Sequence, residues 1–295
     1  MASFPQDVLV MDAGGILSTR FEKKGRGNPR LVAAKRTRFS EAPFEDAPVG
    51  PALKKPAILA ETVQKIRREY GRLDRAALLL PDSWFRINLL DLPLAGEKSE
   101  PVDLIRWAVK KTLPISPEEM RFAWVPLQKG PQGTAVLCTG AVEATLSGIE
   151  SAFRDAEVSV LMIEPVGINI WNAIAARLTT PAERLFFYFS DSEFTTGVFR
   201  GPNPVFLRSR NLSDVRSLRQ EVMLSASYMK NRLEWTAPAE SWVCGNSVDE
   251  SVLEAIHGEF GAPIRTVELE EYMSDAETAP HWKSELTGAS GVFTA

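Results

Sequence analysis

The sequence predicts an α/β protein of two lobes, because the same order of strands, turns and helix occurs twice along the chain. Residues 7–40 read as strand, tight turn, strand, loop and strand, with short apolar runs separated by Gly-rich segments. Residues 184–208 repeat that order, and a long helix with one apolar stripe follows from about residue 213. The duplication predicts one sheet and one core in each lobe.

The first lobe is expected to begin the chain and to include residues 1–97. Its apolar periodicity changes from alternation to helical spacing and back, and Gly71 and Pro81 stand where elements should end. The expected elements are a strand at 8–11 with a turn at 12–15, an exposed connection at 41–57, a helix at 59–70, a buried strand at 77–80 and a half-buried strand at 85–89.

Residues 98–163 are expected to form a small inserted αβ subdomain beside the first lobe. Pro101 suits a first helical turn, and further prolines interrupt the chain before the next strands. The expected order is a helix from 101, strands at 121–127 and 134–138, a helix at 142–153 and a strand at 158–163. We expect none of this segment to join the main sheet of either lobe.

Residues 164–275 are expected to form the second lobe, and residues 276–295 a loose C-terminal tail. The lobe carries the repeated meander, the long helix, a short strand at 242–244 and a helix that ends at Gly261. Residues beyond about 275 show few apolar positions at a regular spacing, which is typical of an unpacked terminus.

Composition limits the classes of function. The chain has 295 residues, of which 44 % are hydrophobic and 24 % charged, as in ordinary globular proteins. The 34 Lys and Arg against 38 Asp and Glu give a net charge of −4, which does not favour a nucleic-acid partner. Two cysteines and two histidines cannot form a typical structural zinc site without carboxylates. No apolar run approaches the ~20 residues that span a bilayer, so we expect a soluble protein without direct membrane insertion.

Several segments, in their order along the chain, resemble the PilM family of type IV pilus assembly proteins. The most specific is Ile105–Leu127, a helix, a proline-flanked aliphatic turn, acidic residues and an aromatic strand. The others are Leu80–Ser83 with the strand that closes on Leu92-Pro93, Ile163–Pro165 before a helix, Leu218–Tyr228, and Gly245–Ser247 before a helix. Together they cover about residues 8–270.

The resemblance implies an actin-like fold related to FtsA, with a nucleotide held between the lobes by a turn from each repeat. It places ATP and Mg²⁺ against eight residues, of which Asp12 and Asp191 would hold the metal. These eight are Asp12, Gly14, Gly15, Asp191, Thr195, Thr196, Gly245 and Asn246. PilM proteins are also cytoplasmic and dock the short N-terminal tail of the membrane protein PilN, which implies a location at the inner membrane through that partner.

Two of the three expected nucleotide elements depart from the family pattern. Glu193 stands where the family has glycine in the second turn, and a carboxylate there would repel phosphates. Asn246 replaces a second glycine after Gly245, and Arg20 is only loosely spaced as the basic residue of the first turn. We therefore expect weakened or lost ATP binding and no catalytic residues.

Three functions remain open on the sequence. The first is a non-enzymatic cytoplasmic scaffold that docks a PilN-like tail in a groove between the first lobe and the insertion, with self-association left open. The second is an active ATPase or small-molecule kinase of the same fold, which the altered loops disfavour. The third is a cytoplasmic module of a type II secretion system, a family that normally continues into a membrane helix.

Overall fold

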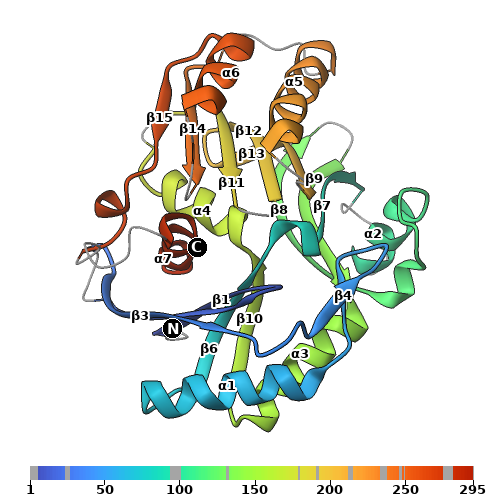
Figure 1. Ribbon diagram of the computed structural model, residues 1–295. Helices are drawn as coiled ribbons and strands as arrows, with labels where there is room; N and C mark the ends of the chain where they lie inside the picture. The colour runs from blue at the N-terminus through green and yellow to red at the C-terminus, as the bar shows by residue number, and fades with distance from the viewer. Residues whose placement is uncertain are drawn as a thin grey trace. The chain divides into compact units, whose positions relative to one another are not determined.

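The computed structural model divides the chain into two units (Figure 1). The first contains residues 1–23 and 31–166, and the second contains residues 24–30 and 167–295. The residues that the structure describes are 6–23, 27–93, 101–130, 133–178, 180–190, 193–211, 215–232, 238–245, 248, 250–274 and 282–294.

A five-stranded sheet with the order β3-β2-β1-β6-β10 forms the centre of the first unit. β1 pairs antiparallel with β2 and parallel with β6, and β10 pairs parallel with β6 at one edge. The strands are β1 (Asp7–Asp12), β2 (Gly15–Glu22), β3 (Arg30–Arg38), β6 (Arg75–Leu80) and β10 (Ser159–Pro165). A hairpin of β4 (Phe44–Asp46) and β5 (Pro51–Leu53) lies between β3 and the first helix in the chain.

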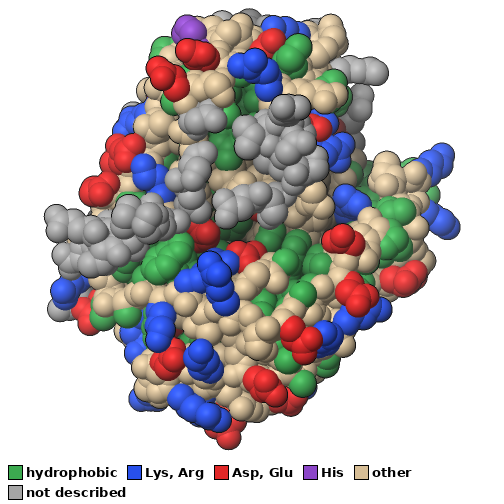
Figure 2. Space-filling view, viewed as in Figure 1, with side chains coloured by type: hydrophobic (Ala, Val, Ile, Leu, Met, Phe, Trp, Pro, Cys, Tyr) green, Lys and Arg blue, Asp and Glu red, His purple; other side chains and the backbone are tan. Residues whose placement is uncertain are grey.

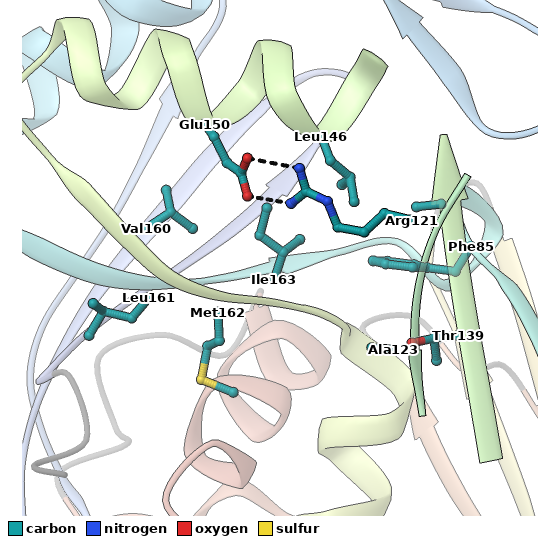
Figure 3. Close-up of a pocket in the computed structure, with 11 residues that line it drawn as sticks. Phe85, Arg121, Ala123, Thr139, Leu146, Glu150, Val160, Leu161, Met162 and Ile163 are labelled. Atoms are coloured by element: carbon teal, nitrogen blue, oxygen red, sulfur yellow. Dashed lines mark hydrogen bonds and ion pairs between the residues drawn. The ribbon is translucent and has the colours of Figure 1, made fainter. Parts of the chain in front are cut away.

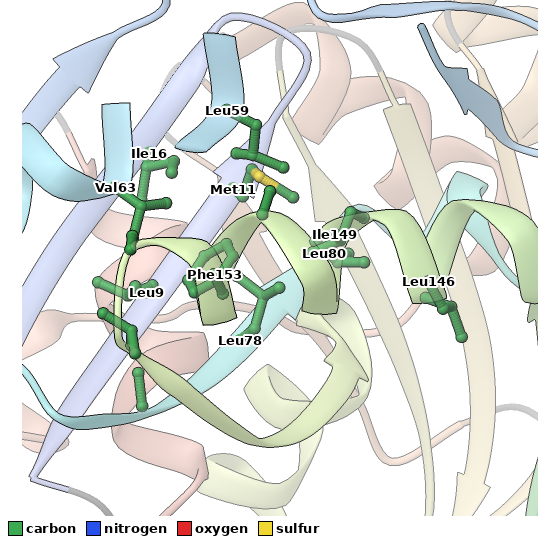
Figure 4. Close-up of a cluster of buried hydrophobic side chains, with 14 of the residues drawn as sticks. Leu9, Met11, Ile16, Leu59, Val63, Leu78, Leu80, Leu146, Ile149 and Phe153 are labelled. Atoms are coloured by element: carbon green, nitrogen blue, oxygen red, sulfur yellow. The ribbon is translucent and has the colours of Figure 1, made fainter. Parts of the chain in front are cut away.

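Helices α1 (Pro56–Tyr70) and α3 (Glu143–Asp155) contribute apolar side chains to the same core as the sheet (Figure 4). Leu59 and Val63 of α1 and Ile149 and Phe153 of α3 are fully or almost fully buried there. Because side chains alternate along a strand, only every second residue of β1 enters this cluster, beginning with Leu9. The spacing of the helix residues is the one that places them on a single face.

A separate three-stranded antiparallel sheet with the order β7-β9-β8 also belongs to the first unit. Its elements are β7 (Arg86–Leu92), α2 (Pro101–Val109), the 3₁₀ turn η2 (Pro117–Glu119), β8 (Met120–Gly130) and β9 (Gly133–Val142), while the 3₁₀ turn η1 (Asp82–Trp84) precedes β7. Ile105 of α2 is buried with Leu92, Val136 and Cys138 in a small core of its own.

The expectation that residues 98–163 stand apart as one insertion is wrong for α3 and β10. β10 pairs with β6 in the five-stranded sheet, and α3 shares the core of that sheet. β7 in turn lies in the three-stranded sheet although we expected it in the first lobe proper. Apolar periodicity fixes the type of an element but not the sheet that it joins, which explains both differences.

The second unit repeats the strand order of the first, as β13-β12-β11-β14-β15. β11, β12 and β13 form an antiparallel meander, and β14 and β15 add in parallel beside β11. The strands are β11 (Glu183–Phe189), β12 (Glu193–Arg200), β13 (Asn203–Asn211), β14 (Glu240–Gly245) and β15 (Ile264–Thr266). In both units a helix lies between the third and fourth strands of the chain order and another precedes the fifth, which confirms the duplicated α/β fold class.

The two faces of the second sheet carry different cores. On one face, α5 (Val215–Arg232) and α6 (Glu250–Phe260) pack with Leu185 and Phe187 of β11. On the other face, Trp171 of α4 (Val166–Ala175) stacks on Phe199 with ring centroids 3.6 Å apart. Side chains alternate along β11, so Phe186 points to the opposite face from Phe187 and also contacts Trp171.

The expected loose tail at 276–295 is wrong for its last part. Residues 275–281 lie outside the described residues, but α7 (Lys283–Gly291) follows the 3₁₀ turn η3 (Leu269–Glu271) and is buried from Leu286 to Gly291. A Cβ on Gly291 would lie 1.9 Å from the Asn169 carbonyl oxygen, so glycine permits the close crossing of α7 and α4. The buried residues of α7 are mostly small and form no apolar stripe, so apolar periodicity could not reveal this helix.

Candidate functional site

The first expected nucleotide turn joins β1 to β2, and its amides are engaged within the chain. The Gly14 and Gly15 N–H groups both donate to Asp12 Oδ1, at 2.7 and 3.0 Å. A Cβ on Gly15 would lie 2.4 Å from the Thr37 carbonyl oxygen, so this glycine allows β3 to pass directly against the turn. The Phe39 N–H donates to the Gly14 carbonyl oxygen at 3.1 Å and fixes the turn against the end of β3.

The basic residue of this turn is Arg36 and not Arg20. Arg36 extends from β3 and forms an ion pair and a hydrogen bond with Asp12 Oδ2. Arg20 lies at the far end of the hairpin, opposite Asp7, and its Nε donates to Asp7 Oδ1 at 2.6 Å. Five residues of strand separate the two ends, or roughly 17 Å at the usual rise. Sequence spacing missed Arg36 because its contact depends on the pairing of β3 with the hairpin.

The second expected turn is closed by its own backbone and carries a buried glutamate. The Ser190 N–H donates to the Glu193 carbonyl oxygen at 3.0 Å, and the Glu193 N–H donates to Ser190 Oγ at 3.2 Å. Glu193 is 1 % exposed. Asp191, expected as a metal ligand, lies outside the described residues. The effect of Glu193 on a phosphate therefore remains a prediction.

Thr195 and Thr196, which we expected to contact one nucleotide, are successive residues of β12. Successive side chains of a strand point to opposite faces, so the two hydroxyl groups cannot line the same surface of the sheet. Thr196 is paired with Phe187, whose side chain lies in the core under α5 and α6. At most one of the two threonines can therefore serve a ligand on a given face.

The third expected element ends β14. A Cβ on Gly245 would lie 2.6 Å from Val248 Cγ2 and 3.3 Å from the Phe189 carbonyl oxygen, so local packing accounts for this glycine. Asn246 lies outside the described residues. Among the described residues, no three His, Cys, Asp or Glu side chains gather as a metal site requires. The first turn therefore does not fit a bound phosphate and metal, because both carboxylate oxygens of Asp12 are engaged within the chain.

A second candidate site is a groove in the first unit, which we call the β10 groove (Figure 3). It has a volume of about 230 Å³. Its walls come from the three-stranded sheet, α3 and β10, and are formed by Phe85, Arg121, Ala123, Thr139, Ala141, Leu146, Glu150, Val160, Leu161, Met162 and Ile163. Most of these side chains are apolar or small, so the groove suits apolar groups.

The edge of strand β10 forms one wall of the β10 groove. Four consecutive residues of β10, from Val160 to Ile163, line the groove, whereas β8 and β9 contribute only alternate residues. Alternate residues indicate a sheet face, and consecutive residues indicate a strand edge. Leu161 has no Cα partner on β6 because a bulge separates the pairs of Val160 and Met162, and it is 42 % exposed.

An arginine clamp joins the two walls of the β10 groove. Arg121 Nε donates to Glu143 Oε2 at 2.9 Å, and its Nη1 donates to Glu150 Oε1 at 2.5 Å. These hydrogen bonds tie β8 to α3, as the dashed lines of Figure 3 show for Glu150. Hydrogen bonds from Arg121 and from Ser147 lower the pKa of Glu143 to about 2. Sequence patterns could not reveal this clamp, since the partners of Arg121 lie 22 and 29 residues away in another element.

A second hollow of the first unit, of about 380 Å³, has a mostly polar and charged lining, formed by Gln64, Arg67, Arg68, Gly71, Asp155, Ala156 and Glu157. Figure 2 shows Lys and Arg interspersed with Asp and Glu on the visible face. Within the described residues, no helix combines the length and the apolar character that a membrane crossing requires.

Comparison by sequence identifies no relative. No family model matches the chain, and no curated protein matches it. The assignment of the fold therefore depends on the structure alone.

Solved structures share the fold over nearly the whole chain. A PilM–PilN type IV pilus biogenesis complex matches with a TM-score of 0.78 at 16 % identity, covering 98 % of this chain and 98 % of that one. The cytoplasmic domain of EpsL, from the type II secretion system of Vibrio cholerae, matches with a TM-score of 0.52 at 12 % identity, covering 86 % and 93 %. A Bacteroides thetaiotaomicron protein with an actin-like ATPase fold matches at 0.53 and 11 %, covering 97 % and 99 %. The chain therefore has the actin-like fold, in a form that closely resembles PilM.

Proposed function

We propose that this chain is a scaffold of type IV pilus assembly that docks an extended cytoplasmic tail of a PilN-like inner-membrane protein in the β10 groove. The observation that carries the proposal is the groove itself, which lies between the main sheet of the first unit and its three-stranded sheet. The similarity to PilM in a complex with PilN supports the choice of partner. In this role the protein acts at the cytoplasmic face of the membrane through its partner and has no catalytic step.

The shape of the β10 groove favours an extended peptide over a compact small molecule. Its volume of about 230 Å³ is below the usual range of small-molecule pockets, which starts at ~300 Å³. β10 is an edge strand, so a peptide can add its backbone along residues Val160–Ile163, which line the groove. The small side chains of Ala123, Thr139 and Ala141 on the opposite wall then leave space for the apolar side chains of the peptide.

The charges of the clamp favour a tail that carries a basic side chain. Arg121 pairs with two carboxylates, so the clamp as a whole carries one net negative charge, with Glu150 in the lining of the groove and Glu143 beside it. A basic side chain in the tail would complement this charge, chiefly by speeding the encounter and setting the register. The apolar contacts with β10 and α3 would supply most of the affinity.

Titration calorimetry with the full chain tests the proposal. The probe is a synthetic peptide with the cytoplasmic N-terminal sequence of a PilN-like single-pass membrane protein from the same organism. Leu161→Asp places a carboxylate in the apolar wall and should weaken binding at least about tenfold. Val32→Asp is the matched control, because Val32 is 47 % exposed on β3, the opposite edge strand of the same sheet. No binding by the wild-type chain, or equal losses in the two variants, would contradict the proposal.

The similarity to the EpsL cytoplasmic domain keeps a type II secretion role as a second candidate. That match has a TM-score of 0.52 against 0.78 for the PilM complex, so the first candidate is favoured. The same calorimetric titration separates them when tails from both systems are compared, since the tail of the true partner should bind more tightly.

A further inference from the structure

We infer that the first nucleotide turn of this chain is an anion site filled from within. The Asp12 carboxylate takes the two backbone donors that a phosphate would use, and Arg36 neutralises it. This inference is independent of the β10 groove and concerns the opposite end of the sheet order, where β1, β2 and β3 lie together.

The backbone N–H groups of Gly14 and Gly15 are the central observation. Successive backbone N–H groups in a tight turn form a concave site for an anion, which is how phosphate loops work. Here the N–H groups of Gly14 and Gly15 converge on one oxygen, Asp12 Oδ1, at 2.7 and 3.0 Å. An ionised carboxylate makes stronger hydrogen bonds to such donors than a neutral acceptor does. A phosphate would have to displace it.

The guanidinium of Arg36 acts against the metal that would accompany a nucleotide. It forms an ion pair with Asp12 Oδ2, the oxygen that does not accept from the turn. A Mg²⁺ ion at this carboxylate would meet a positive charge at close range, and like charges repel. The arrangement depends on Gly15, because only a residue without a Cβ lets β3 bring Arg36 so close to the turn.

The consequence is that the first lobe holds its turn without a nucleotide. The carboxylate and guanidinium form a neutral pair that takes the place of phosphate and metal. The fold can therefore keep this turn ordered without a bound nucleotide.

Binding of inorganic phosphate and of Mg·ATP to the full chain tests the inference by calorimetry. The wild type should bind both with Kd values weaker than about 1 mM. Asp12→Ala releases the two amides and removes the carboxylate that Arg36 neutralises, so this variant should bind phosphate at least about tenfold more tightly than the wild type. Asp12→Asn keeps an oxygen for the amides and should gain less, and the double variant Asp12→Ala/Arg36→Ala should lose the gain.

Two outcomes would overturn the inference. One is wild-type binding of Mg·ATP below about 1 mM that weakens in Asp12→Ala, which would make Asp12 a metal ligand. The other is no gain in Asp12→Ala with native circular dichroism. If that variant does not fold, the amide resonances of Gly14 and Gly15 in the wild type decide. Shifts on addition of phosphate contradict the inference, and unchanged resonances support it.

Discussion

The fifth strand of each five-stranded sheet holds the same place in the strand order, but the two edges differ. β10 has 7 residues, lies along a groove and exposes Leu161. β15 has 3 residues, and its Arg265 pairs with Glu271 and lies over the Trp242 ring at 4.3 Å. Short and charged edges protect sheets from unwanted strand pairing. The duplicated fold therefore keeps one edge open and closes the other, which fits docking at the first unit only.

The largest expected effect is on stability, and it tests whether α3, which forms one wall of the β10 groove, belongs to the core of the five-stranded sheet. Phe153 of α3 is fully buried among residues of β1 and α1. Phe153→Ala should lower the free energy of unfolding by about 3–5 kcal/mol. Chemical denaturation measures this, with Trp107→Ala as the control, because Trp107 is 78 % exposed on α2. A loss below about 1 kcal/mol would mean that α3 is not part of this core.

A bulky side chain in the β10 groove should block docking of the tail at the β10 edge. Ala123 is exposed in the three-stranded sheet, so Ala123→Phe should leave stability nearly unchanged. The new phenyl ring would occupy the space that the bound tail peptide needs. The affinity for the tail, measured by fluorescence anisotropy, should fall at least about tenfold. Val32→Phe on the β3 edge is the control, because Val32 is exposed there, and it should bind like the wild type. Equal binding by both variants would place the docking site elsewhere.

The fold was largely predictable from the sequence, and the sites were not. Apolar periodicity gave both meanders, because strand and helix spacings depend on local burial. It could not show that β10 joins β6, since that choice depends on contacts between distant segments. Arg36 and Arg121 were missed for the same reason, because each meets its partner across elements. α7 was missed because its buried residues are mostly small and form no apolar stripe.

A smaller effect concerns the Arg121 clamp at the β10 groove. Glu143→Gln should lower stability at pH 7 by less than about 1 kcal/mol, because the Arg121 pair is partly exposed. The pKa of Glu143 is lowered from 4.5 to about 2 in the folded state, so its contribution is complete above the unfolded value. The difference between wild type and variant should shrink as pH falls from about 4.5 to about 2. A difference that grows with acid in denaturation curves would contradict this sign.

The smallest expected effect is that of nucleotide. With a Kd weaker than about 1 mM, Mg·ATP at about 1 mM stabilises the wild type by less than about 0.4 kcal/mol. The melting temperature should therefore barely move, and tail affinity should stay within about twofold. Glu193→Gly should increase the shift if that carboxylate alone blocks the second turn. A large shift in the wild type would show that the nucleotide site is intact.

Hydrogen–deuterium exchange of the full chain, with and without the tail peptide, tests the central claim most directly. If the tail pairs with the open edge, amides of β10 and the facing part of β8 should exchange more slowly in the complex. Amides of β15 and of β3 should exchange at unchanged rates, since those edges take no part in docking. Protection centred on β15 or β13, or unchanged exchange in β10 at saturating peptide, would contradict the account.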